Sequence, residues 1–477
     1  MSLIRRIQQN TPEPLPEPRI PPAAPAAVAV SNGHHALAEE AAIASFVPEM
    51  DQLAAERRRQ LLDWMLERLW VDMDEDNTNK PDAQRLLASR FQELYRQSHV
   101  TLSLEEQKLL FQEVVDEILG FGPLEQLIRD DSISEIMVNG PESVFVERQG
   151  KLVESGVLFR DDAHVQRVIE RIIRPLGRHI DRKWPIVDAR LPDGSRVNAI
   201  IPPCAIDGSS ITIRKFPKGR LGVEDLIRYG SVTPQMAEFL RACVVSHLNI
   251  VVSGGTGSGK TTLLNILSGF IPDGERIVTI EDSAELQLQQ RHVVRLETKN
   301  PEIDGTGRVS IRDLVVNSLR MRPDRIVVGE CRSGEALDML QAMNTGHDGS
   351  LTTTHANTPR DCISRLETLC LMSGVDLPQK VVREQIASAI DLIIQQSRLR
   401  DGSRKITAVT EVQGMEGDTI VMQDIFRFEE KGMDSNNKVV GEFRPLGVRP
   451  RFTPRLEASG FNLPAEVFSA SGPRRLY

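Results

Sequence analysis

The residues best suited to chemistry lie in the segment VVSGGTGSGKTT, residues 251–262. Within it, Gly254, Gly259, Lys260 and Thr261 match the pattern GxxxxGK followed by Thr, between an apolar run and a helix-like run. Glycines let successive backbone N–H groups converge on phosphate oxygens, and the start of a helix adds partial positive charge. Lys260 is predicted to reach the β- and γ-phosphates and the Thr261 hydroxyl to bind Mg²⁺. A simple glycine-rich turn would need neither residue.

Two acidic residues follow apolar runs that are typical of buried strands. Glu330 ends RIVVGE and is predicted to lie near the metal, through water, as the acid of a Walker B strand does, although Asp is commoner there. Glu281, in IVTIED, is predicted to polarise water, because phosphoryl transfer needs a group that orients the attacking molecule. An alternative is that Asp282 caps a helix and Glu285 completes a capping box. That alternative leaves Glu281 unexplained.

Two histidines, His347 and His355, bracket a further strand-like run in NTGHDGSLTTTHANTP. A histidine in such a place is often only a satisfied polar residue. Beside a phosphate-binding loop, however, an imidazole near the γ-phosphate can report hydrolysis through one hydrogen bond. The spacing of the two histidines and the lack of a nearby cysteine pair argue against zinc.

Alternating strands and helices must position these groups. After residue 229 the chain reads NIVVSG, TTLLNILSGF, RIVTIED, RIVVGE, EALDMLQAM and SLTTTHA. Continuous β-branched runs that lead into helices indicate a parallel sheet covered on both faces, so we predict an α/β domain. The carboxyl ends of such strands are where open α/β sheets bind ligands.

Composition and periodicity predict further domains around this one. We expect a disordered Pro/Ala-rich arm over 1–47, a helical segment over 48–110 and an α+β domain over 111–228. The α/β domain then covers 229–400, and a β-rich appendage covers 401–477. In the α+β part, a helix with an apolar face from Val165 to Leu176 separates strands with Asn-Gly and Asp-Gly turns.

The overall composition restricts the classes of function. The chain has 477 residues, a net charge of -9 and 4% aromatic residues, which argues against a dedicated nucleic-acid binder with stacking platforms. Its five cysteines occur singly, as expected for reduced thiols in a cytoplasmic protein without zinc. We find neither a signal peptide nor an apolar stretch of about 20 residues that would span a membrane.

The motifs together resemble a known superfamily. Walker A, Asp box, Walker B and His box motifs of secretion and pilus ATPases are similar to GGTGSGKTT, TIEDSAELQLQQ, LRMRPDRIVVGECRSGEALDMLQAMNTGHDGS and TTTHANTPRDCISRLE. Longer phrases resemble the CpaF family, the assembly ATPases of tight-adherence (Tad/Flp) pili. These are SEIMVNGPESVFVERQGKL, VDARLPDGSRVNAIIPP, SSITIRKF, LQLQQRHVVRLETK and SRLRDGSRKIT. The resemblance covers roughly residues 110–430.

This resemblance implies a cytoplasmic ring of six subunits at the bacterial inner membrane, where it would act on membrane platform proteins. An N-terminal domain would be hinged to a RecA-like ATPase domain, with ATP and Mg²⁺ between them. The tetracysteine zinc module of many type II secretion motors is absent from the sequence. The implied nucleotide-binding residues are Gly254, Gly255, Thr256, Gly257, Ser258, Gly259, Lys260, Thr261, Thr262, Arg196 and Arg214. The implied catalytic residues are Glu281, Glu330, Lys260 and His355, and the metal residues are Thr261 and Glu330.

These inferences favour an ATP-hydrolysing motor that powers assembly, or both assembly and retraction, of a Tad/Flp-type pilus. The alternatives are a RecA-like nucleic-acid translocase, a type IV secretion ATPase and a scaffold that binds nucleotide without hydrolysing it. ATP is preferred to GTP because no NKxD-type base-reading motif follows the strands. The acidic charge leads us to expect no nucleic-acid partner.

Overall fold

The computed structural model describes residues 57–69, 82–148, 150–216, 219, 221–301 and 305–469. The arm predicted over 1–47 lies outside these residues. The chain divides into two compact units, Met1–Glu125 and Gln126–Tyr477.

The described part of the first unit is helical. Residues 57–69 form a helix, followed by α3 (Ala83–Gln97), α4 (Leu104–Ile118) and the short η2 (Gly122–Leu124). Ser103 begins α4 with a complete capping box, which fixes the start of this helix. The apolar faces share one core, whose buried members include Leu61, Met65, Leu69, Leu87, Phe91, Leu110, Val114 and Ile118. Because α4 continues to Ile118, the helical segment passes the boundary that the sequence suggested at residue 110.

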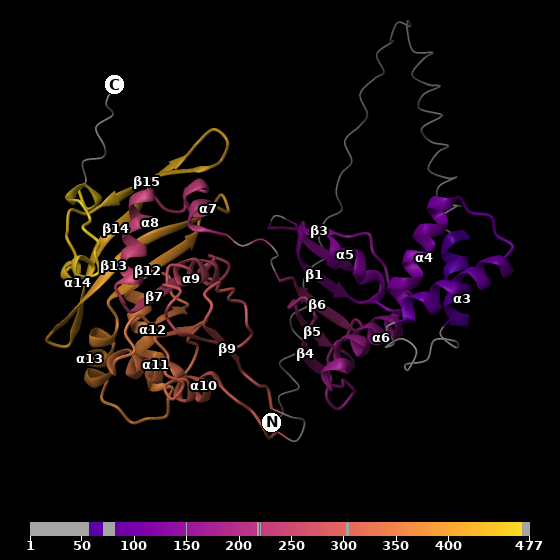
Figure 1. Ribbon diagram of the computed structural model, residues 1–477, viewed down its shortest axis with the longest axis horizontal. Coiled ribbons are helices and arrows are strands. Elements are labelled where there is room, and N and C mark those ends of the chain that lie inside the picture. The colour runs from indigo at the N-terminus through magenta and orange to yellow at the C-terminus, as the bar shows by residue number, and fades with distance from the viewer. Residues whose placement is uncertain are drawn as a thin grey trace, which may run out of the picture. The chain divides into compact units, whose positions relative to one another are not determined.

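The second unit begins with an antiparallel sheet of six strands (Figure 1). The strands are β1 (Ile133–Asn139), β2 (Val144–Arg148), β3 (Lys151–Glu154), β4 (Ile186–Arg190), β5 (Arg196–Ile200) and β6 (Ser210–Arg214), in the order β3-β2-β1-β6-β5-β4. The helices are α5 (Glu125–Arg129), α6 (Asp162–Ile173) and η3 (Arg174–Leu176). The α6 residues of the predicted apolar face are buried, but Leu176 lies beyond Pro175 in η3 and is exposed. The proline ends the α-helix because it cannot donate a backbone hydrogen bond.

Three strands of this sheet place arginines side by side. The β4–β5 hairpin turns at Asp193 and Gly194, whose φ of 92° is in the left-handed region that favours glycine. Its register sets Arg190 opposite Arg196, and the β5–β6 register sets Arg196 opposite Arg214. Directly opposite residues of neighbouring strands share one face, so the three arginines form a row.

The second sheet of this unit has nine strands. They are β7 (Ile250–Gly254), β8 (Ile277–Glu281), β9 (Val293–Glu297), β10 (Arg325–Val328), β11 (Leu351–Thr354), β12 (Leu392–Arg398), β13 (Arg404–Glu416), β14 (Thr419–Met433) and β15 (Val439–Pro445). Their order is β15-β14-β13-β12-β7-β11-β10-β8-β9. Pairing is parallel from β12 to β9 and antiparallel from β12 to β15. The stretch after residue 400, expected to be an appendage, therefore continues this sheet through the β12–β13 hairpin.

Helices cover both faces of the parallel strands (Figure 1). They are α7 (Val223–Arg228), α8 (Pro234–Val245), α9 (Lys260–Ser268), α10 (Ile311–Ser318), α11 (Glu335–Asn344), α12 (Pro359–Leu371), α13 (Gln379–Ala389) and α14 (Thr453–Ala458), with η4 (Ala465–Val467). On β7, Ile250 and Val252 pack with α8, α9 and α14, whereas Val251 packs with α10 to α13. The predicted α/β fold, with its N-terminal α+β part, is confirmed.

Candidate nucleotide-binding site

The glycine-rich loop joins β7 to α9. All five residues of β7 are buried, and the loop leaves the strand at Gly254, where a Cβ would lie 2.3 Å from the Gln396 carbonyl oxygen. Gly257 and Gly259 have φ values of 70° and 95°, which only glycine adopts without strain. These glycines allow the loop to curl at the start of α9, where unpaired N–H groups attract anions.

Lys260 is a buried cation in this loop. Its side chain is 8% exposed, and its Nζ donates to the Gly255 carbonyl oxygen at 3.0 Å. Burial lowers the pKa of this ammonium group. Among the described residues, no carboxylate lies within ion-pair distance of Nζ. A buried ammonium without a counterion fits an anionic ligand such as a phosphate.

Glu330 follows β10 after Gly329 and lies between the side chains of His355 and Arg332. Its Oε1 lies 3.0 Å from His355 Nε2, and its Oε2 lies 2.8 Å from an Arg332 guanidinium nitrogen. His355 follows β11 and also lies 3.3 Å, through Nδ1, from Lys260 Nζ. Burial, and next the charge of Lys260, lower the pKa of His355 and favour the neutral imidazole. A neutral ring protonated on Nε2 satisfies both contacts.

Glu281, at the end of β8, is 3% exposed, and burial raises the pKa of its carboxyl group. Its Oε1 accepts hydrogen bonds from the backbone N–H groups of Glu285 and Leu286, at 3.0 and 3.1 Å. The residues after β8 form a loop without a helix. The alternative that Asp282 caps a helix is therefore wrong; its carboxylate lies 3.2 Å from Arg332.

One cavity of about 390 Å³ brings most of the predicted residues together. Its lining includes Thr256, Gly257, Gly259, Lys260, Thr261, Thr262, Glu281, Glu330, His355, Arg196 and Arg214. Three predicted loop residues, Gly254, Gly255 and Ser258, are not part of the lining. His347 is also absent from it. The lining also contains residues that no motif in the sequence indicated as part of the site: Asp282, Ser283, Glu285, Ile311, Gly329 and Arg332.

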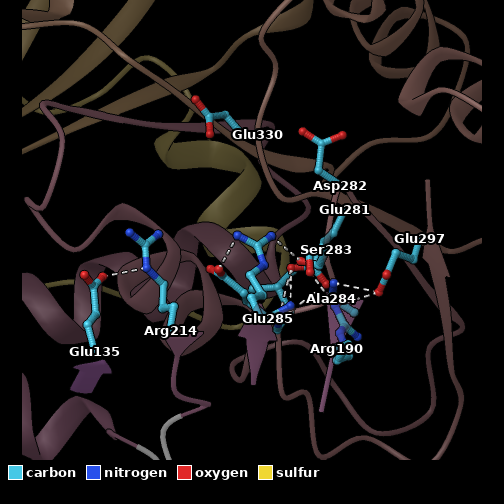
Figure 2. Close-up of polar contacts among 12 residues, drawn as sticks. Glu135, Arg190, Arg214, Glu281, Asp282, Ser283, Ala284, Glu285, Glu297 and Glu330 are labelled. Atoms are coloured by element: carbon cyan, nitrogen blue, oxygen red, sulfur yellow. Dashed lines mark hydrogen bonds and ion pairs between the residues drawn. The ribbon is translucent and has the colours of Figure 1, made fainter. Parts of the chain in front are cut away.

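The arginine row faces the loop after β8. Arg196 lies 2.9 Å from Glu285 and donates to the Ser283 carbonyl oxygen at 3.1 Å. Arg214 pairs with Glu135 of β1 at 2.7 Å, as Figure 2 shows.

The third arginine of the row, Arg190, was not selected from the sequence. It pairs with Glu297 at 2.8 Å. The predicted Asp-Gly turn could have identified it, because pairing outward from that turn sets Arg190 opposite Arg196.

The chemistry of the lining fits Mg²⁺ bound together with a phosphate. The Thr261 hydroxyl and the Glu330 carboxylate line the same cavity. Mg²⁺ prefers oxygen ligands and takes few from the protein when phosphates and water supply the rest. Among the described residues, no group of three or more His, Cys, Asp or Glu side chains is arranged to hold a metal.

The fold and this cavity agree with a match to a protein family. The model of the Type II/IV secretion system protein family matches residues 117–440, more than half of the chain. The chain belongs to this family. The match covers the arginine row, the loop before α9 and the strands that carry Glu281 and Glu330.

Curated relatives have related names. A putative conjugal transfer protein of Mycobacterium tuberculosis is 36% identical over 307 residues, 63% of this chain and 87% of the relative. The type IV secretion system protein VirB11 of Bartonella henselae is 33% identical over 328 residues, 60% of this chain and 90% of the relative. The crystal structure of the VirB11 ATPase of Brucella suis with sulphate has 32% identity and a TM-score of 0.34, covering 60% of this chain and 94% of that one.

None of the helices among the described residues is both long enough and apolar enough to cross a membrane.

Proposed function

We propose that the chain is a Mg²⁺-dependent ATPase of the secretion and pilus motor class. One observation carries this proposal: a single cavity collects the buried Lys260, two acidic strand ends and two arginines of the neighbouring sheet. Membership of the Type II/IV secretion family supports it.

In this proposal, each group has a defined task. The loop amides and Lys260 bind the phosphates, and Thr261 and Glu330 hold Mg²⁺, which when bound neutralises charge on the phosphate oxygens. Glu281 orients the attacking water. Because burial raises the pKa of its carboxyl group, this group can accept a proton from water at a pH nearer to neutral. His355, between Lys260 and Glu330, senses the γ-phosphate.

We further propose that the ribose and base occupy an adjoining cavity of about 230 Å³. It shares Thr261 and Thr262 with the first cavity, and Phe216 and Leu221 give it an apolar wall. Such a wall suits a purine ring. No NKxD-type motif follows the strands of the nine-stranded sheet, which favours ATP over GTP.

For the biological output, we propose a homo-hexamer that works at the cytoplasmic face of the bacterial inner membrane and drives platform proteins of a Tad/Flp-type pilus. The resemblance of the sequence to the CpaF family supports this assignment. The N-terminal domain would close onto the ATPase domain and open again. ATP must bind these closed and open arrangements with different affinities if its binding is to do work.

A role in type IV secretion or conjugal transfer is a second candidate, because the curated relatives carry those names. Deletion of the gene distinguishes the two outputs. Loss of pili with normal DNA transfer supports the role in pilus assembly. Normal pili with loss of DNA transfer support the role in type IV secretion.

The activity itself is tested by phosphate release from ATP and Mg²⁺ by the purified full chain. We expect Lys260→Ala to lower kcat by about 100- to 1,000-fold, because a preorganised cation is removed from the transition state. Light scattering of the purified chain measures its mass and so tests the homo-hexamer. Addition of DNA to the phosphate-release assay tests the alternative of a nucleic-acid translocase. Undiminished turnover by Lys260→Ala would refute the ATPase assignment, and strong salt-sensitive stimulation by DNA would favour the translocase.

A further inference from the structure

The row of three arginines needs counterions. Arg190, Arg196 and Arg214 occupy opposite positions on β4, β5 and β6. Like charges at opposite positions of neighbouring strands repel each other. A row of this kind is therefore stable only where anions neutralise it.

The anions come from two places. Arg214 pairs with Glu135 in its own sheet, whereas Arg190 and Arg196 contact residues after β8 and at the end of β9. Glu297 Oε2 lies 2.8 Å from Arg190 and accepts the backbone N–H of Ala284 at 3.0 Å. Arg190 also donates to the Ser283 hydroxyl. Figure 2 shows Arg190, Ser283, Ala284 and Glu297 converging at this point.

The loop held in this way also binds Glu281. Ser283 and Ala284 form one side of the loop, and the next two residues donate their N–H groups to the Glu281 carboxylate. Glu281 and Glu297 are register partners on the adjacent strands β8 and β9. The loop is thus tied to Glu281 at one end and, through Glu297, to Arg190 at the other.

We propose that Arg190, Ser283 and Glu297 form a clasp through which the six-stranded sheet fixes the position of Glu281. This inference rests on the proposed function, because it assigns Glu281 to water activation. Arg190 is not part of the phosphate cavity lining, so it is a positioning residue rather than a catalytic one.

The test compares the full-length wild-type chain with Arg190→Ala, Glu297→Ala and the double variant. Each change is expected to lower kcat by about 10- to 100-fold, since a shift of about 1 Å in a reacting group costs about that much. The Kd of a non-hydrolysable ATP analogue should stay within about twofold, because the phosphate ligands are intact. The kcat of the double variant should be no lower than that of either single variant, as expected when Arg190 and Glu297 act as one coupled unit.

A second measurement needs no nucleotide. Hydrogen exchange of the 283–286 amides should become faster in both single variants, because the hydrogen bonds that order the loop are weakened. The matched control is Arg148→Ala in β2 of the same sheet, which removes a half-exposed ion pair with Asp130. It should change neither kcat nor exchange at 283–286.

The outcomes are distinguishable. Wild-type kcat in Arg190→Ala, or a parallel loss in Arg148→Ala, would overturn the clasp while the ATPase assignment stands. A wild-type chain without turnover would overturn the proposed function. In that case the exchange data alone decide: faster exchange only in the clasp variants supports the clasp, and unchanged exchange refutes it.

Discussion

The two sheets of the second unit carry their functional groups in different ways. In the nine-stranded sheet, the strands β7, β8, β10 and β11 are buried along their whole length, and polar groups such as Glu330 and His355 follow the strand ends. In the six-stranded sheet, β5 and β6 alternate buried and accessible residues, and their arginines lie within the strands.

The difference follows from how each sheet is covered. A parallel sheet with helices on both faces leaves only its edges and strand ends accessible, so chemistry gathers there. An antiparallel sheet with one accessible face can present a row of charges along that face. The nine-stranded sheet therefore carries the glycine-rich loop and the acids, and the six-stranded sheet contributes Arg196 and Arg214 to the same cavity.

The largest effect that we expect concerns the core of the nine-stranded sheet. Arg325 is fully buried and lies 2.5 Å from Glu275, a carboxylate with 18% side-chain exposure. Replacing it in Arg325→Met should lower the free energy of unfolding by about 3–5 kcal/mol, since it leaves the mostly buried Glu275 carboxylate without its guanidinium partner and with only His247, at 3.4 Å, beside it. Urea unfolding of the full chain measures this loss. A loss below about 1 kcal/mol would mean that solvent already neutralises Glu275.

The next effect tests the contribution of the six-stranded sheet. Arg196→Ala should lower kcat/KM by about 100-fold, because it removes a cation from the cavity and leaves Glu285 unpaired beside the phosphates. Steady-state kinetics measure the change. Arg196→Lys is the matched control and should recover part of the loss, since the charge remains but the guanidinium fork does not. Equal activity of Arg196→Ala and wild type would show that the nine-stranded sheet suffices.

The smallest effect that we expect concerns an exposed ion pair of the six-stranded sheet, to be compared with the buried pair of Arg325 and Glu275 in the nine-stranded sheet. The ion pair of Arg148 with Asp130 has side-chain exposures of 48% and 34%. Arg148→Ala should cost less than about 1 kcal/mol, because solvent screens exposed pairs. The same urea unfolding measures it. A cost similar to that of Arg325→Met would contradict the expectation that solvent screens the pair of Arg148 with Asp130.

Much of the site could be predicted because its signals are local. The glycines before Lys260 and the apolar runs before Glu281 and Glu330 each indicate an element and its end, and the cavity lining includes all three charged residues. The alternative of a helix capped by Asp282 was wrong because hydrogen bonds to the Glu281 carboxylate hold that segment as a loop. No local pattern contains those bonds.

The sequence by itself determined the alternation of strands and helices, the glycine-rich loop between β7 and α9 and the acids at the strand ends, since each depends on residues within one short segment. Only the tertiary structure decided that Glu297 faces Arg190, that Glu285 faces Arg196 and that Glu330 faces His355. These pairs join strands and loops that are distant along the chain. Their choice depends on how the two sheets meet and on strand order, which short-range propensity does not encode.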